Sequence, residues 1–197
     1  MILRLFDDIE ARLAYVRKVD DEFIFHPPEK DPDKELPGTP AINHFGLWNE
    51  NTTRLTQMRP LTPPAVFIEF YPIVWSEMGR NTVHGDIVIR FHIVTATLAQ
   101  TDTPYRDEAL ARFRLIRAIK AAFVNFGGGA DNDGRSYSRW QYYGSTPDHN
   151  HEQICEDLEE WRTHAIDCSV VVDDRLIELD NVTLDRFLTS TAHEPGA

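Results

Sequence analysis

The sequence holds only two cysteines, Cys155 and Cys168, and no Cys-x-x-Cys pair. A disulfide scaffold or a thiolate zinc site needs more cysteines at closer spacing, so we expect neither, and a reducing compartment is the natural setting. No run of about 18 apolar residues occurs, so no membrane-spanning helix is expected. The N-terminus turns acidic at Asp7 and Asp8 and lacks the apolar centre of a secretory signal.

Basic residues are also scarce, because 20 Lys and Arg against 32 Asp and Glu give a formal net charge of −12. Sequence-independent binding to nucleic acid depends on clustered basic side chains, and an anionic membrane surface favours them too. We therefore expect neither exposed nucleic acid nor a membrane as the partner. The 197 residues are 42% hydrophobic and 11% aromatic, which is enough for one domain with a substantial core.

The longest regular pattern in the sequence is a strand over residues 85–98. One face of this strand is entirely apolar by the period-2 rule and consists of Ile87, Ile89, Phe91 and Ile93. The opposite face mixes apolar residues with Arg90 and His92. A strand of this length spans roughly 45 Å, so it can protrude from its own domain and pair with a neighbour.

The chain before this strand opens with an amphipathic helix. Its apolar residues recur at the 3.6-residue spacing and are Ile2, Leu5, Phe6, Ile9, Leu13 and Val16. A short strand is predicted at residues 23–25. Residues 26–40 contain five prolines and few apolar side chains, which predicts a surface loop. Residues 42–48 are a candidate edge strand, and residues 65–71 are a strand expected to pair antiparallel with the long one.

A second helix is predicted over residues 107–126. Its broad apolar face consists of Leu115, Ile116, Ile119, Ala122, Phe123 and Phe126, and three glycines at 127–129 end it. Residues 139–145 resemble a strand. Residues 154–172 alternate at their end and predict another, although Ile154, Leu158 and Trp161 would also suit a helix.

These elements predict an α+β fold, in which an antiparallel β-sheet is packed by two main α-helices in a single domain. The domain covers residues 1–172, with residues 26–40 as its proline-rich surface loop. Residues 173–197 form a C-terminal extension and a frayed tail.

Candidate chemistry is limited to one polar cluster. Asp148, His149 and His151 could place two imidazoles and a carboxylate near a metal, with His164 as a third nitrogen ligand. A polar hairpin turn supplies the same residues without a metal, and we favour that interpretation. The sequence predicts no bound cofactor.

Other short patterns have structural interpretations. The glycine-rich residues 127–134 follow a helix rather than precede one, and they lack the Lys and Ser/Thr of a phosphate loop. Cys168 sits in an apolar alternation, and acids surround Cys155 and disfavour its thiolate. The charged run at residues 156–160 is interpreted as a solvated face. The only basic cluster lies on the second helix and consists of Arg106, Arg112, Arg114, Arg117 and Lys120.

The order of these elements, together with the segment Pro-Ala-Val-Phe-Ile-Glu-Phe at residues 64–70, resembles a known family. It is similar to the tail terminator and minor tail (tail-completion) proteins of long-tailed phages, in particular prophage-encoded ones. The resemblance covers residues 1–172 and rests on the pattern of elements, since that family has no catalytic motif to compare.

The resemblance implies a non-enzymatic structural protein of tail morphogenesis. It would assemble as a homo-oligomeric ring, possibly a hexamer, that caps the tail tube and meets the head–tail connector. DNA would pass through only as cargo, and the protein would occur in the host cytoplasm during assembly and then in the virion tail. The alternative is a small metal-dependent enzyme that uses the Asp148, His149 and His151 cluster.

A ring of such acidic subunits needs its few basic groups at the interfaces between subunits. A hexamer would carry about −72, six times the formal −12 of one chain. We therefore predict an oligomer interface in which Arg106, Arg114 and Arg117 face an acidic surface of the adjacent subunit.

Overall fold

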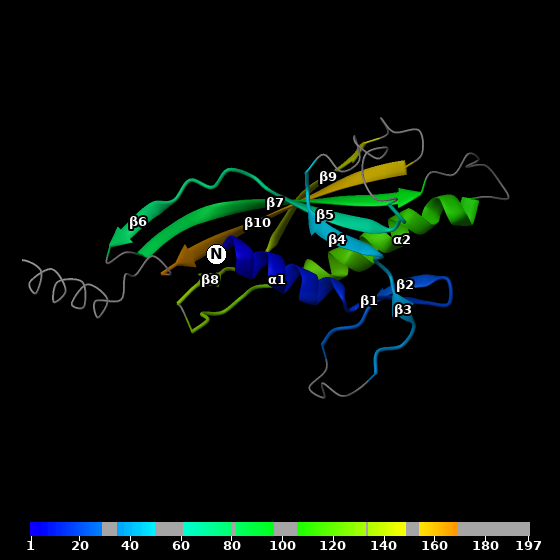
Figure 1. Ribbon diagram of the computed structural model, residues 1–197, viewed down its shortest axis with the longest axis horizontal. Coiled ribbons are helices and arrows are strands. Elements are labelled where there is room, and N and C mark those ends of the chain that lie inside the picture. The colour runs from blue at the N-terminus through cyan, green and yellow to red at the C-terminus, as the bar shows by residue number, and fades with distance from the viewer. Residues whose placement is uncertain are drawn as a thin grey trace, which may run out of the picture.

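A computed structural model describes residues 1–28, 35–49, 61–79, 82–96, 106–132, 134–148 and 154–168 of the chain (Figure 1). Its centre is a two-stranded antiparallel ladder of β7 (Thr82–Ala96) and β10 (Ile154–Asp167). The ladder runs without a register shift from the pair Val83 and Asp167 to the pair Ala96 and Ile154. At about 3.3 Å per residue it is roughly 45 Å long.

Shorter strands flank each half of this ladder. The half that holds the end of β7 is bordered by β5 (Ala65–Phe70), β4 (His44–Leu47) and β9 (Gln141–Asp148). The other half is bordered by β6 (Ser76–Gly79) and β8 (Ser136–Tyr137). The sheet is mixed, since β4 runs parallel to β5.

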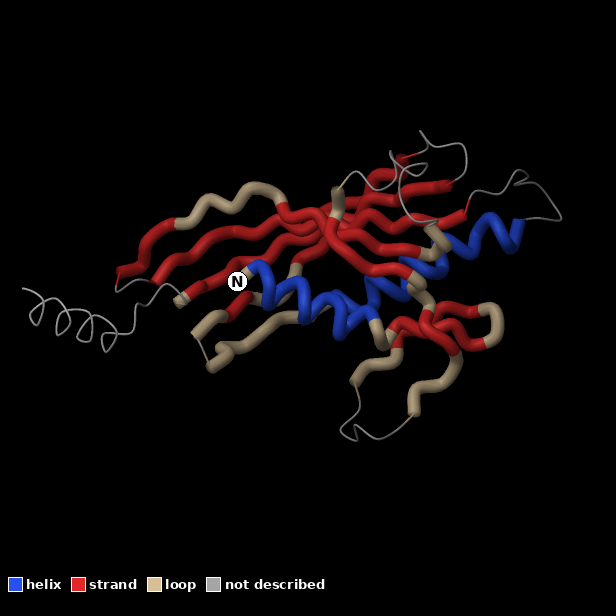
Figure 2. The backbone as a smooth tube through the Cα atoms, viewed as in Figure 1, coloured by secondary structure: helices blue, strands red, loops and turns tan. Residues whose placement is uncertain are grey.

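Two helices lie against the same face of the curled sheet (Figure 2). The first is α1 (Ile2–Leu13), which buries Leu5, Ile9 and Leu13. The second is α2 (Arg106–Phe123), which buries Leu115, Ile119 and Phe123. The apolar face of β7 meets them in one continuous core that includes Ile87, Ile89, Phe91 and Ile93.

A second, three-stranded sheet follows α1 directly. It pairs β1 (Val16–Val19) with β2 (Glu22–Phe25) on one side and with β3 (Thr39–Pro40) on the other. Asp20 turns the β1–β2 hairpin with a φ of 54°, a left-handed conformation that aspartate tolerates better than most residues. This small sheet packs beside α2 through Phe23.

The predicted fold class is wrong. Among the described residues 48% are in strands and 21% in helices, so the chain is mostly β rather than a sheet packed by two main helices. The seven-stranded sheet is mixed and curled rather than antiparallel. Two causes explain the difference. The parallel pairing of β4 depends on contacts remote in sequence, and β1 and β3 are too short and polar to show a strand pattern.

Most individual elements agree with the sequence pattern. Residues 154–167 form a strand and not a helix, and the strand predicted at 65–71 does pair antiparallel with β7. The edge position of β4 is also confirmed. Val16 belongs to β1 and not to the first helix, because that helix ends at Leu13 and the chain then turns.

Two segments, residues 26–40 and 173–197, were predicted to lie outside the core, and the structure describes part of the first only. Within the proline-rich segment 26–40, residues 39 and 40 form β3 and pair with β1, so that end is not a loop. The extension at 173–197 lies outside the described residues.

Candidate functional site

The outward side of α2 carries two of the predicted interface arginines as free cations. Arg106 and Arg117 are exposed, and neither contacts an acidic group within the described part of the chain. Arg114 lies 3.8 Å from both Glu22 on β2 and Asp107 on α2. It therefore also joins the helix to the small sheet.

Two exposed apolar side chains accompany these cations. Phe113 is 49% exposed and Val124 is 55% exposed. The four positions 106, 113, 117 and 124 share one helix face, because the spacing is close to whole turns of 3.6 residues. Exposed aromatic and arginine side chains on one face are typical of the centre of a protein interface.

Lys120, although on the same helix, is a half-buried cation that is paired within its own chain. Its Nζ lies 3.0 Å from Glu159 Oε2, and that carboxylate is 1% exposed. Tyr142 and Ser145 donate hydrogen bonds of 2.8 and 2.7 Å to the same carboxylate. Burial alone would lower the pKa of Lys120, but the contacts with Tyr142 and Glu159 outweigh it and raise the pKa.

The outer face of the central strands holds a second buried charge network. His92 Nδ1 lies 2.5 Å from Glu156 Oε1, and His92 Nε2 lies 3.1 Å from Glu69 Oε2. Both ring nitrogens of His92 therefore face a carboxylate. Trp48 stacks on the imidazole at a centroid distance of 3.8 Å. Next along β7, Arg90 lies 3.4 Å from Glu69 and from Glu160.

The interpretation of residues 156–160 as a solvated face is therefore wrong. Glu156, Asp157 and Glu159 are 3%, 2% and 1% exposed. Alternate positions on β10 face opposite sides of the sheet, so Glu156 meets His92 outside while Glu159 meets Lys120 inside. The sequence did contain one indication that these acids are buried. His92 and Lys120 stand among apolar residues, and such groups need acidic partners when they pack against the sheet.

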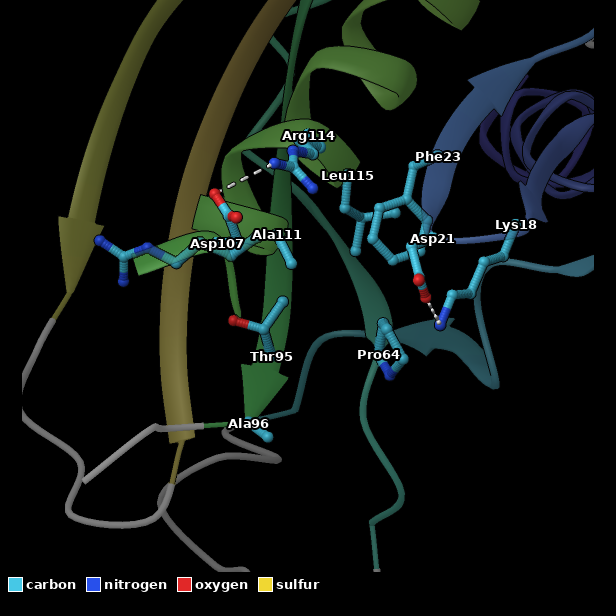
Figure 3. A pocket seen from close by; sticks show the side chains of 11 residues that line it. Lys18, Asp21, Phe23, Pro64, Thr95, Ala96, Asp107, Ala111, Arg114 and Leu115 are labelled. Carbon is cyan, nitrogen blue, oxygen red and sulfur yellow. Dashed lines mark ion pairs between the residues drawn. The ribbon is translucent and has the colours of Figure 1, made fainter. Parts of the chain in front are cut away.

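A hollow of about 500 Å³ opens beside the N-terminal half of α2, between that helix, the end of β7 and the β1–β2 hairpin (Figure 3). Phe23 and Leu115 lie side by side and contribute to its apolar wall. Polar groups at its edge form two ion pairs, Lys18 with Asp21 and Arg114 with Asp107. Arg114 thus connects this hollow to the predicted interface. Sequence reasoning missed the hollow, because residues far apart in the chain form it.

The structure separates two members of the proposed metal cluster. Asp148 pairs with Glu156 near the start of β10, whereas His164 lies eight positions further along that strand, about 26 Å away. His164 Nδ1 instead contacts Asp86 at 2.8 Å. His149 and His151 lie outside the described residues. Among the residues that are described, no group of three or more His, Cys, Asp or Glu side chains could hold a metal ion.

The glycine-rich segment after α2 packs back on α1. The carbonyl of Gly129 accepts a 2.7 Å hydrogen bond from Arg4, and Gly128 forms a bridge with Tyr137. Tyr137 donates a 2.8 Å hydrogen bond to Asp8 on α1. The segment thus anchors the first helix to the sheet.

Neither cysteine is fully buried, and neither forms a disulfide. Thr82 Oγ1 donates to Cys168 Sγ at 3.5 Å. Neither helix that the structure describes is long and apolar enough to cross a membrane.

No protein-family model matches the chain, and no curated protein is significantly similar to it. The function must therefore be argued from the geometry of its own residues.

Proposed function

We propose that the protein is a non-enzymatic structural subunit of a phage or prophage tail, which assembles as a ring at the end of the tail tube. The observation that carries the proposal is the long β7–β10 ladder. At its end bordered by β6 the ladder reaches the start of α1, where the Met1 amino group lies 2.9 Å from Asp167, and the exposed edge strand β6 extends beyond that helix as an arm (Figure 1). A small subunit with such an arm has the means to reach a neighbour. The family resemblance of residues 1–172 supplies the context of a tail.

The distribution of charge supports the same proposal. The chain is strongly acidic, yet Arg106 and Arg117 contact no acid in the described part of their own chain. In an acidic protein, cations without an acidic partner in their own chain can offset the repulsion between neighbouring subunits at their interface. Acidic groups left over would face the lumen, where they repel the DNA backbone and let it slide without sticking.

The proposal is tested on the untagged, purified protein by native mass spectrometry and negative-stain electron microscopy. We expect one discrete oligomer with the outline of a closed ring. Metal analysis of the same sample addresses the alternative, a metal-dependent enzyme. A monomeric protein that holds a stoichiometric metal, lost on changing His149 and His151 to alanine, would overturn the proposal.

A further inference from the structure

The projecting end of the sheet exposes apolar side chains that its own core does not use. Val74, just before β6, is 82% exposed, and Met78 on β6 is 60% exposed. Beside Met78 is Glu77, an exposed acid that contacts no basic group within the described residues. We call this end, formed by residues 74–79 and the start of β7, the arm. All four residues of β6 are exposed, as expected for a strand at the edge of a sheet.

The opposite end of the molecule holds the hollow beside α2 (Figures 1 and 3). Its walls include the apolar side chains of Phe23, Ala111 and Leu115. Thr95 also lines it and is only 7% exposed, yet its hydroxyl makes no hydrogen bond within the described part of the chain. A buried hydroxyl without a partner costs free energy, so this one indicates a missing ligand.

We infer that the hollow receives the arm of a second copy of this chain. The inference rests on the proposed function, and it names the contact that would build the ring. Met78 of the incoming arm would pack on the wall formed by Phe23 and Leu115, where its thioether suits an aromatic side chain. Glu77 would approach Arg114, whose two acidic neighbours at 3.8 Å leave its N–H groups without hydrogen bonds among the described residues.

The chemistry of the hollow favours a peptide segment as its occupant. The Thr95 hydroxyl can donate to a backbone carbonyl, and an edge strand such as β6 has unpaired carbonyls on its outer side. A volume of about 500 Å³ is large enough for several side chains. The arm supplies an apolar side chain next to an acid, which complements a hollow that is apolar inside and whose edge carries three cations, Lys18, Arg112 and Arg114, against two acids, Asp21 and Asp107.

The positions of the two surfaces select the symmetry of the assembly. The arm and the hollow lie at opposite ends of an elongated subunit (Figure 1), so one chain cannot join its own two surfaces. A contact between different surfaces of identical chains is heterologous and repeats from each copy to the next. Such a contact closes into a ring when the rotation between neighbours permits, whereas a two-fold dimer would bring identical surfaces together.

Cysteine crosslinking between different variants tests the contact directly. Met78→Cys and Ala111→Cys are each made in a background with Cys155→Ser and Cys168→Ser, and are mixed under mild oxidation. We expect a disulfide-linked dimer in the mixture and none with either variant alone. The matched control pairs Met78→Cys with Leu3→Cys, a position that is 69% exposed on α1 and lines neither the hollow nor the outward side of α2. Equal crosslinking to both positions would overturn the inference.

A complementation experiment tests the heterologous geometry. Met78→Asp should disable the arm, and Ala111→Trp should fill the hollow, so each variant alone should be a folded monomer by circular dichroism and sedimentation. A mixture should form a heterodimer through the one intact arm and the one intact hollow. We expect this mixed contact to be at least about tenfold tighter than self-association of either variant. No heterodimer, or intact rings from either variant, would contradict the inference.

The two proposals fail in different ways. If the unmodified protein forms a ring but Met78 and Ala111 do not crosslink, the arm contact is wrong and the ring proposal stands. If the unmodified protein is a monomer at every concentration, both are wrong.

Discussion

Phe123 on α2 meets Phe91 on β7 edge to face, with ring centroids 4.9 Å apart and planes at 89°. Both side chains are completely buried, and Phe123 also stacks on Trp140. This aromatic group connects the helix to the middle of the long ladder. The contact is therefore where the stability of the fold can be measured most simply.

Replacing Phe123 by alanine should destabilise the protein by about 3 to 5 kcal/mol, because it removes a buried ring and leaves a cavity. The measurement is the free energy of unfolding from urea melts. Phe113→Ala is the matched control, since that ring lies on the exposed side of the same helix. A loss below about 1 kcal/mol for Phe123→Ala would show that this face of α2 is not core.

The buried pair of His92 and Glu156 gives a second prediction. His92→Ala removes one partner of a buried ion pair and should cost about 3 to 5 kcal/mol. Adding Glu156→Gln should recover part of that loss, because a neutral amide is less costly to bury beside the missing ring than a carboxylate is. Urea melts of the two single variants and the double variant give the coupling free energy. Additive losses would mean that the two side chains do not act as a pair.

The pattern of β7 shows what the sequence could predict. Four apolar residues at alternate positions, from Ile87 to Ile93, indicated one buried face, and the structure buries all four. Local periodicity is enough for such a strand, because its burial repeats with the period of the backbone. In the segment that holds β10 only residues 166–172 alternate, and residues 154–161 are predicted to continue the same strand because no cap or stop signal separates them.

Contacts between remote segments could not be predicted in this way. Glu159 looks like a surface residue until Lys120, Tyr142 and Ser145 are brought to it by pairing and helix packing. The hollow has the same origin, since Phe23, Thr95 and Leu115 meet only in the folded chain. The sequence shows which cations lie on α2, but it does not show which of them form ion pairs with acidic residues.

Alkaline pH should weaken the fold through Tyr137. Burial, and then the hydrogen bond to Asp8, raise the pKa of this phenol above the ordinary tyrosine value of 10.0. The phenol therefore ionises more readily in the unfolded chain. Its stabilising contribution is complete below pH 10 and is lost as the pH rises toward the raised pKa of the folded state.

The variant Tyr137→Phe should lose about 1 kcal/mol at neutral pH, from the missing hydrogen bond, and its stability should then fall less steeply above pH 10. Urea midpoints measured at neutral and alkaline pH check this. Tyr143→Phe is the control, because that side chain is 61% exposed. Parallel pH profiles for the wild type and Tyr137→Phe would contradict the argument.

The central claim is self-association through the outward side of α2, and sedimentation of a charge-reversal variant measures it most directly. Arg106→Glu combined with Arg117→Glu changes two of the predicted interface arginines, neither of which contacts an acidic group in the described part of the chain. Arg139→Glu, at an exposed position outside α2, is the control. We predict that the wild type and the control sediment as one discrete oligomer, while the double variant sediments as a folded monomer. An oligomer that is unchanged in the double variant at both low and high salt would contradict the account.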